Sequence, residues 1–177
     1  MNVTPHTVAK VSIPKARIQW VASKMHITYT EVLAKLNELL EYVKDNTIAE
    51  VKLWIDRFVP KRTGQLRTDL KEWIEGSTLS NYVLRVTLGT YIPYAAALNE
   101  FNSAQVRHAG EVGYVYYPNK PGIRGRVILW DPEAIGNYFG KLVEYTKNVV
   151  MKYATMGSNI FFNKSETAKT EVIKSLG

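Results

Sequence analysis

Residues that could carry out catalysis or bind a metal are few in this chain, and their spacing does not favour either. The three histidines, His6, His26 and His108, lie far apart and lack the short spacing of metal-ligand pairs. The chain has no cysteine, so no thiolate nucleophile or Cys-based metal site can form. The phosphate-binding patterns GxxxxGKS and GxGxxG and the nucleophile pattern GxSxG are also absent.

The acidic residues that could be considered for catalysis have simpler interpretations. Glu72 and Glu75 could form a carboxylate pair, but their neighbours indicate a solvated face. Asp131 is followed by a proline and a glutamate, an arrangement typical of a helix start. Because no nucleophile–base pair or metal cluster is present, we expect no enzymatic activity and no cofactor.

Aromatic residues stand beside cations in one segment. Tyr114, Tyr116 and Tyr117 are close in sequence to Lys120 and Arg124. Such a mixture can stack on nucleic-acid bases, but tyrosine is also enriched in protein–protein interfaces. No DNA- or RNA-binding motif accompanies the cluster, so we favour a protein interface.

The net charge of +7 is distributed unevenly. Residues 1–30 contain no acid, and residues 105–130 contain only Glu111. These two segments suit a negatively charged neighbour, either nucleic acid or an acidic protein surface, although solubility alone also accounts for them. The candidates for such a contact are Lys10, Lys15, Arg17, Arg107, Lys120, Arg124 and Arg126.

Length and hydropathy indicate one globular domain. The chain has 177 residues, of which 46% are hydrophobic, enough to bury a core. No run approaches the roughly 20 apolar residues that span a bilayer, and residues 1–10 lack the apolar centre of a signal peptide. We therefore expect synthesis and folding in the cytoplasm, without a cleaved leader or membrane contact.

The strongest periodic pattern predicts a long amphipathic helix over residues 28–58. Thr28 and Glu31 have the spacing of a capping box, and apolar residues then recur every three or four positions. The segment 45–47 could kink this helix. Pro60 should end it, because the residue before a proline avoids helical geometry.

A β-hairpin is predicted next. Residues 82–88 alternate between apolar and polar positions, which is typical of a half-buried strand. We predict that residues 70–75 form its antiparallel partner and that residues 76–81 form the turn. A short helix is expected at residues 91–101, with Pro93 in its first turn.

A second long helix is predicted to start at Asp131 and end at Gly157. The fold class is thus α+β, with two long helices packed on a small, mostly antiparallel sheet. We expect an extended arm at 1–20 with a short strand at 10–13, a single domain at 21–155 with an inserted loop at 102–126, and a tail at 156–177. We expect the arm, the loop and the tail to become ordered only on assembly.

Two motifs and their order carry a resemblance to a known family. The first, Val59-Pro60-Lys61-Arg62-Thr63-Gly64-Gln65-Leu66-Arg67, directly follows the long predicted helix. The second, Tyr94-Ala95 followed by Asn99-Glu100-Phe101, comes after the predicted strand. Over roughly residues 30–153 the chain resembles the tail-completion family of tailed bacteriophages, which comprises neck (head–tail joining) and minor-capsid proteins. The family commonly has Gly after the aromatic residue, where this chain has Asn102.

The resemblance implies a structural virion protein rather than an enzyme. It implies a ring of identical subunits at the phage neck that joins the DNA-filled head to the tail, with the portal or connector, the tail-tube or terminator proteins and passing DNA as partners. One alternative is a tail-terminator protein that caps the tail tube. Another is a basic DNA-binding protein that uses the N-terminal arm.

Site residues are expected in the two motifs and in the aromatic positions of the loop and tail. In the first turn, Gly64 supplies backbone freedom and Leu66 faces inward, while Arg62 and Arg67 face solvent. The structural turn residues are Pro60, Thr63, Gly64 and Leu66. The candidate interface residues are Arg62, Arg67, Tyr94, Glu100, Phe101, Tyr114, Tyr116, Tyr117, Phe161 and Phe162.

Overall fold

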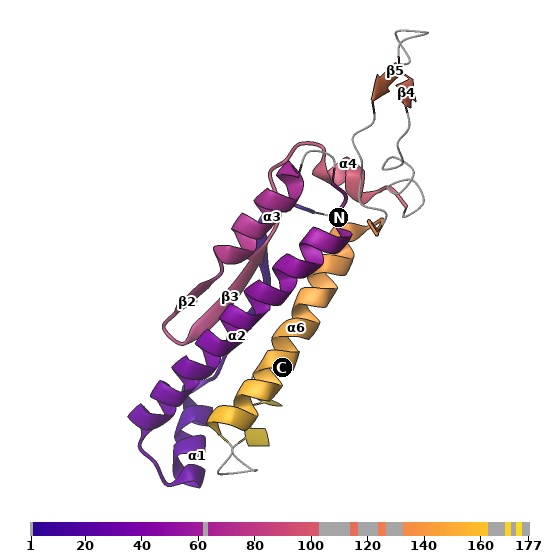
Figure 1. The fold of residues 1–177 in the computed structure, drawn as a ribbon. Helices are drawn as coiled ribbons and strands as arrows, with labels where there is room; N and C mark the ends of the chain where they lie inside the picture. Colours follow the sequence, from indigo (N-terminus) through magenta and orange to yellow (C-terminus); the bar gives the residue numbers. More distant parts are fainter. Residues whose placement is uncertain are drawn as a thin grey trace.

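The computed structural model describes residues 2–61, 64–102, 114–116, 124–126, 133–162, 169–170 and 173–174. The fold is α+β, as predicted, with two long helices and a small antiparallel sheet (Figure 1). Helices α2 (Tyr29–Phe58) and α6 (Tyr138–Phe161) lie side by side and antiparallel along the long axis of the molecule (Figure 1).

Helix α2 begins and ends where the sequence predicts. The Glu31 backbone N–H donates to Thr28 Oγ1 at 3.1 Å, and the Thr28 N–H donates to the Glu31 carboxylate at 2.7 Å, which completes the capping box. The helix ends at Phe58, two residues before Pro60. The helix is continuous through residues 45–47, where the sequence allows a kink.

The contact between α2 and α6 depends on a glycine inside α6. A Cβ at Gly157 would lie 2.3 Å from Leu39 Cδ1 and 3.0 Å from Tyr42 Cδ1. Gly157 therefore permits close approach of the two helices. The prediction that α6 ends at Gly157 is wrong. The helix continues to Phe161, and Phe162 directly after it is fully buried. The predicted boundary between the domain and the tail, at residues 155/156, is therefore wrong, because residues 156–162 continue α6 and contribute to the core.

The start of α6 also differs from the prediction. The helix begins at Tyr138 rather than near Asp131, and Glu133 lies in a turn. Tertiary hydrogen bonds explain the difference, since the Ile135 N–H donates to Phe58 O at 3.0 Å and the Asn137 N–H donates to Asn99 O at 3.1 Å. These bonds hold the segment before α6 in a non-helical conformation. Asp131 and Pro132 lie outside the described residues.

The three-stranded sheet has the order β1-β3-β2, with both pairs antiparallel. Its central strand is β3 (Val83–Leu88), in which Leu84, Val86 and Leu88 are buried as the alternation predicts. Tyr82 was expected on the same face but is exposed, because Asn81 and Tyr82 form the turn with positive φ values. Figure 1 shows β2 and β3 running alongside α2.

Residues 70–75 are helical, so the predicted strand there is wrong. They belong to α3 (Gln65–Glu75), whose residues Leu66, Leu70 and Ile74 recur every fourth position and are buried. That spacing gives one apolar helix face, which packs against α2 and β3. The partner of β3 is instead the short strand β2 (Thr78–Ser80).

The first twenty residues form part of the domain rather than an extended arm. Strand β1 (His6–Ser12) pairs with β3, with a bulge between Thr7 and Ala9, and α1 (Lys15–Met25) follows it. The side chains of Val3, Val8, Val11 and Ile18 are buried in the common core. The predicted arm is wrong, because β1 pairs with β3 and these four side chains pack into the same core as the helices.

Three further elements lie between β3 and α6. Helix α4 (Ala95–Asn99) lies within the predicted short helix but is shorter, and Pro93 precedes the helix rather than standing in its first turn. Strands β4 (Tyr114–Tyr116) and β5 (Arg124–Arg126) pair antiparallel inside the predicted loop. Apart from Asn102, the remaining loop residues fall outside the described chain. Among the described helices, none is long and apolar enough to cross a membrane.

Candidate interface site

The first motif joins α2 to α3. After Val59 and Pro60, both buried, the chain turns and Gly64 occupies the position before α3 with φ +89°. This conformation favours glycine, so the predicted role of Gly64 is confirmed. Leu66 is buried, also as predicted, whereas Arg62 and Thr63 lie outside the described residues.

Arg67 does not face solvent, and its predicted interface role is wrong. Its side chain is only 7% exposed. The guanidinium donates through Nε to Val59 O at 2.8 Å and through Nη1 to Asp56 O. These carbonyls belong to the last turn of α2 and its C-cap, where a cation is electrostatically favoured. Arg67 therefore holds α3 against the end of α2.

A second polar contact anchors the other side of α3. Thr90 Oγ1 donates to the Asp69 carboxylate, and it accepts the Ile92 N–H at 3.0 Å. Thr90 is buried, so this chain of bonds positions the segment that leads into α4. This contact cannot be predicted from the sequence, because a single Asp and a single Thr 21 positions apart form no recognisable motif.

The second motif supplies a cap for α6. The N-cap residue Asn137 makes no side-chain capping bond of its own. Instead Asn99, which is 4% exposed at the end of α4, accepts the Phe139 N–H at 2.8 Å through Oδ1. Tyr138 in the first turn of α6 donates its hydroxyl to Ala95 O at 3.0 Å. The second motif thus satisfies backbone groups of a helix 40 residues further along the chain.

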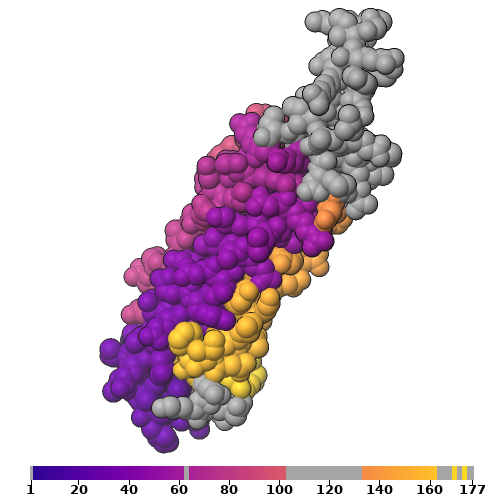
Figure 2. Space-filling view, viewed as in Figure 1, coloured from indigo at the N-terminus to yellow at the C-terminus, as the bar shows by residue number. Residues whose placement is uncertain are grey.

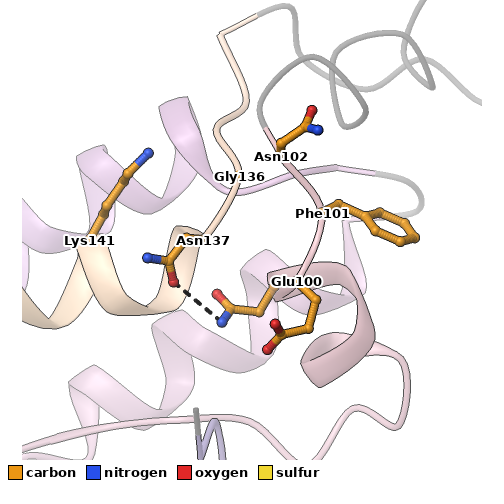
Figure 3. A pocket seen from close by; sticks show the side chains of 7 residues that line it. Glu100, Phe101, Asn102, Gly136, Asn137 and Lys141 are labelled. Atoms are coloured by element: carbon orange, nitrogen blue, oxygen red, sulfur yellow. Dashed lines mark hydrogen bonds between the residues drawn. The ribbon is translucent and has the colours of Figure 1, made fainter.

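A hollow lies where α4 meets the start of α6. It is lined by Asn99, Glu100, Phe101, Asn102, Gly136, Asn137 and Lys141 (Figure 3). Gly136 is buried against the chain after α4, since a Cβ there would lie 2.3 Å from Phe101 O. The hollow offers amides, one carboxylate and one ammonium group, but no nucleophile–base pair. Its chemistry suits polar contact with a partner rather than catalysis.

Aromatic side chains are exposed around the same end. Tyr91 is 68% exposed, Phe101 43% and Tyr94 39%. The Tyr91 ring makes an edge contact with Trp73, with ring centroids 5.7 Å apart. Glu100 is exposed as well. The exposure of Tyr94, Glu100 and Phe101 is compatible with their predicted interface role, which stays a prediction.

The remaining interface candidates have different surroundings. Phe161 is half-buried, with its ring in edge contact with Tyr42, and Phe162 is fully buried. Phe162 is therefore a core residue and its predicted interface role is wrong. For Tyr114 and Tyr116 the structure describes only strand backbone, and Tyr117 lies outside the described chain.

The basic candidates are divided in the same way. Lys10 in β1 is exposed, as are Lys15 and Arg17 in α1. For Arg124 and Arg126 only the backbone of β5 is described, and Arg107 and Lys120 lie outside the described residues. The three exposed cations remain candidates for an anionic neighbour.

One polar cluster between α2 and α6 was not predicted at all. The Glu50 carboxylate accepts hydrogen bonds from Tyr153, from Tyr145 at 3.1 Å and from Lys152 at 3.0 Å. The hydrogen bond from Tyr153 is the main cause that lowers the pKa of Glu50, and the same bond raises the pKa of Tyr153. Because Glu50 lies on one helix and its donors on the other, only the packed structure reveals the cluster.

Among the described residues, no group of three His, Cys, Asp or Glu side chains could hold a metal. His6 and His26 are exposed, and His108 is outside the described chain. Glu75 pairs with Lys52 across α3 and α2 rather than with Glu72.

No family model matches the chain, and no curated protein or solved structure was found to be similar to it. The functional argument therefore rests on the two sequence motifs, the fold and the site.

Proposed function

We propose that this chain is a structural subunit of the neck of a tailed bacteriophage. In this role it forms a homo-oligomeric ring that joins the portal or connector of the DNA-filled head to the tail. The proposal starts from the resemblance of the two motifs to the tail-completion family.

The observation that carries the proposal furthest is that the second motif and the end of α2, directly before the first motif, converge on one segment. The two motifs are separated by 26 residues, yet the second motif and the end of α2 both bond to the segment that precedes α6. Phe58 O, just before the first motif, accepts the Ile135 N–H, and Asn99 O in the second motif accepts the Asn137 N–H. An ion pair between Arg57 and Glu133 joins the same segments. The motifs thus build one end of the helix pair.

This end has the properties of a docking surface. Its backbone is held by buried hydrogen bonds, and Tyr91, Tyr94 and Phe101 are exposed on it. Rigid, exposed aromatic residues are the kind that contribute most to protein–protein binding. A neck subunit must contact a different protein at its end, above or below the ring, so an aromatic end suits this task.

The test is deletion of the gene from the phage that encodes it, followed by electron microscopy of the lysate. We expect filled heads and separate tails that do not join, or particles that lose their DNA. Supplying the wild-type gene in trans should restore joined particles. Infectious particles of normal appearance that lack the protein would contradict the proposal.

Tail length in the deletion experiment and DNA binding by the purified chain separate the alternatives. A tail terminator stops growth of the tail tube, so its loss should give tails of uncontrolled length. A free DNA-binding protein should bind duplex DNA as a monomer, with affinity that falls steeply as salt increases. Separate heads and normal-length tails would favour the neck over both.

A further inference from the structure

The outer face of the three-stranded sheet carries two cations directly opposite each other. In the antiparallel register, Lys10 of β1 faces Arg85 of β3, and Thr78 of β2 lies on the other side of Arg85. Both charged side chains are exposed, on the face opposite to buried Leu84 and Val86. Like charges at opposed positions of a sheet are destabilising, so this arrangement gives no benefit to the isolated subunit.

Nothing in the described chain neutralises this pair. The strands β1, β2 and β3 contain no acidic residue, and residues 2–30 contain none either. Neither Lys10 nor Arg85 forms an ion pair with any residue that the structure describes. We call the surface formed by Lys10, Arg85 and Thr78 the cationic sheet face.

An acidic surface of complementary charge lies on α2. Glu38 and Asp45 are seven residues apart, so they lie on the same side of the helix, about 10.5 Å apart along its axis. Both are exposed and neither forms an ion pair with a described residue. We call these two residues the acidic α2 stripe.

The two surfaces point in opposite directions. The stripe lies about half a turn away from buried Leu40 and Thr47, which face the core. The cationic sheet face likewise points away from the core, on the far side of the sheet from the helices. Figure 2 shows α2 covering much of the viewed surface of the molecule. A contact between the sheet face of one copy and the α2 stripe of the next is therefore head-to-tail. Such a contact gives a ring where the rotation between successive copies closes, and an open filament where it does not.

We propose that the cationic sheet face of one subunit binds the acidic α2 stripe of a second copy of this chain. The inference rests on the proposed function in that it identifies the contact between ring subunits. Pairing through the sheet edges is disfavoured, because β2 has only three residues and β1 contains a bulge. Nucleic acid fits less well, since two cations neutralise only about two phosphates and known DNA contacts use several times more.

The experiment measures self-association of the full chain by sedimentation at a series of concentrations. Variant A carries Lys10→Glu and Arg85→Glu, and variant B carries Glu38→Lys and Asp45→Lys. Each variant alone presents like charges at the contact, so we expect its self-association to be weaker by about tenfold or more. An equimolar mixture of A and B should assemble again, because the altered faces are then complementary in alternating order.

The mixture distinguishes a broken contact from a misfolded variant, since misfolding in A would not be rescued by B. The matched controls are Lys147→Glu and Glu144→Lys, which change exposed charges on α6 and should leave self-association unchanged. A wild-type chain that stays monomeric at every concentration overturns the proposal. So does self-association that neither A nor B alters, or DNA binding by the wild type that A removes while self-association persists.

The result is independent of the test in phage particles. If the chain assembles in solution without response to either variant, the contact is wrong and the neck function is untouched. If A and B behave as expected but deletion of the gene leaves normal particles, the contact stands and the neck function is wrong.

Discussion

The middle of the α2–α6 pair and the end built by the two motifs are held together in different ways. In the middle, buried apolar residues at helical spacing make the contact, and Gly157 lets the helices approach. At the motif end, single side chains bond to backbone groups of distant segments, as Arg67 and Asn99 do. The middle depends on area buried, so its energy is spread over many residues. The motif end depends on a few hydrogen bonds, so removal of one side chain leaves a backbone group without its partner.

Truncation in the middle should have the largest effect on stability. Leu40 is fully buried in α2, so Leu40→Ala should lower the free energy of unfolding by about 2–5 kcal/mol. Leu53 is on the same helix but is 71% exposed, so Leu53→Ala should change it by less than about 0.5 kcal/mol. Urea denaturation of both variants checks this. Equal effects would mean that burial does not distinguish the two faces of α2.

Loss of the buried guanidinium at the motif end should come next. Arg67→Met keeps much of the volume but leaves Val59 O and Asp56 O without their donors, which should cost about 1.5–3 kcal/mol. The control is Arg85→Met, an exposed arginine on the sheet, measured at a dilution where the chain is monomeric. Thermal or urea unfolding gives both values. An unchanged Arg67→Met variant would show that water replaces these bonds without loss.

The cap on α6 should contribute less. Asn99→Leu removes the acceptor for the Phe139 N–H and should cost about 0.5–2 kcal/mol, the range measured for N-cap residues. Asn99→Asp keeps an acceptor and places a negative charge at a helix N-terminus, so it should lose less. Hydrogen exchange at Phe139 follows the bond directly. Similar exchange rates in Asn99→Leu and wild type would rule out the cap.

The sequence predicts the middle of the molecule better than its ends, for a physical reason. Helix α2 and strand β3 are visible because burial of one face imposes a period on the sequence. Residues 70–75 were assigned to a strand although Leu66, Leu70 and Ile74 already had helical spacing, so that error was avoidable. The first twenty residues carry only scattered valines, and their burial depends on pairing with β3, which lies about seventy residues away.

The candidate site was predicted in part. Gly64 and Leu66 were assigned correctly, because a glycine turn and an inward leucine are local features. Arg67 is predicted to face solvent because arginine is usually exposed. No local sequence pattern indicates that its guanidinium donates to two backbone carbonyls at the end of α2. The start of α6 was misplaced for a related reason. An Asp-Pro-Glu sequence favours a helix locally, but bonds to Phe58 O and Asn99 O at the motif end override that preference.

The smallest expected effect concerns the Glu50 cluster, which is polar like the motif end but lies along the middle. Hydrogen bonding to Tyr153 first, and to Lys152 and Tyr145, lowers the folded-state pKa of Glu50 below its ordinary value of 4.5. A carboxyl whose pKa is lower in the folded state stabilises the fold above its unfolded pKa, and this stabilisation disappears as the pH falls through the folded pKa. The wild type should therefore be slightly more stable than Glu50→Gln above pH 4.5, and the difference should shrink below it. Because Glu50 is partly exposed, solvent keeps the effect small.

Urea midpoints of wild type and Glu50→Gln across this pH range give the difference in stability, with Glu144→Gln as an exposed control on α6 that should show no such trend. A gap between wild type and Glu50→Gln that stays constant from neutral to acidic pH would mean that the carboxylate charge does not hold the two helices together, and that the tyrosine hydroxyls bond equally well to a neutral amide.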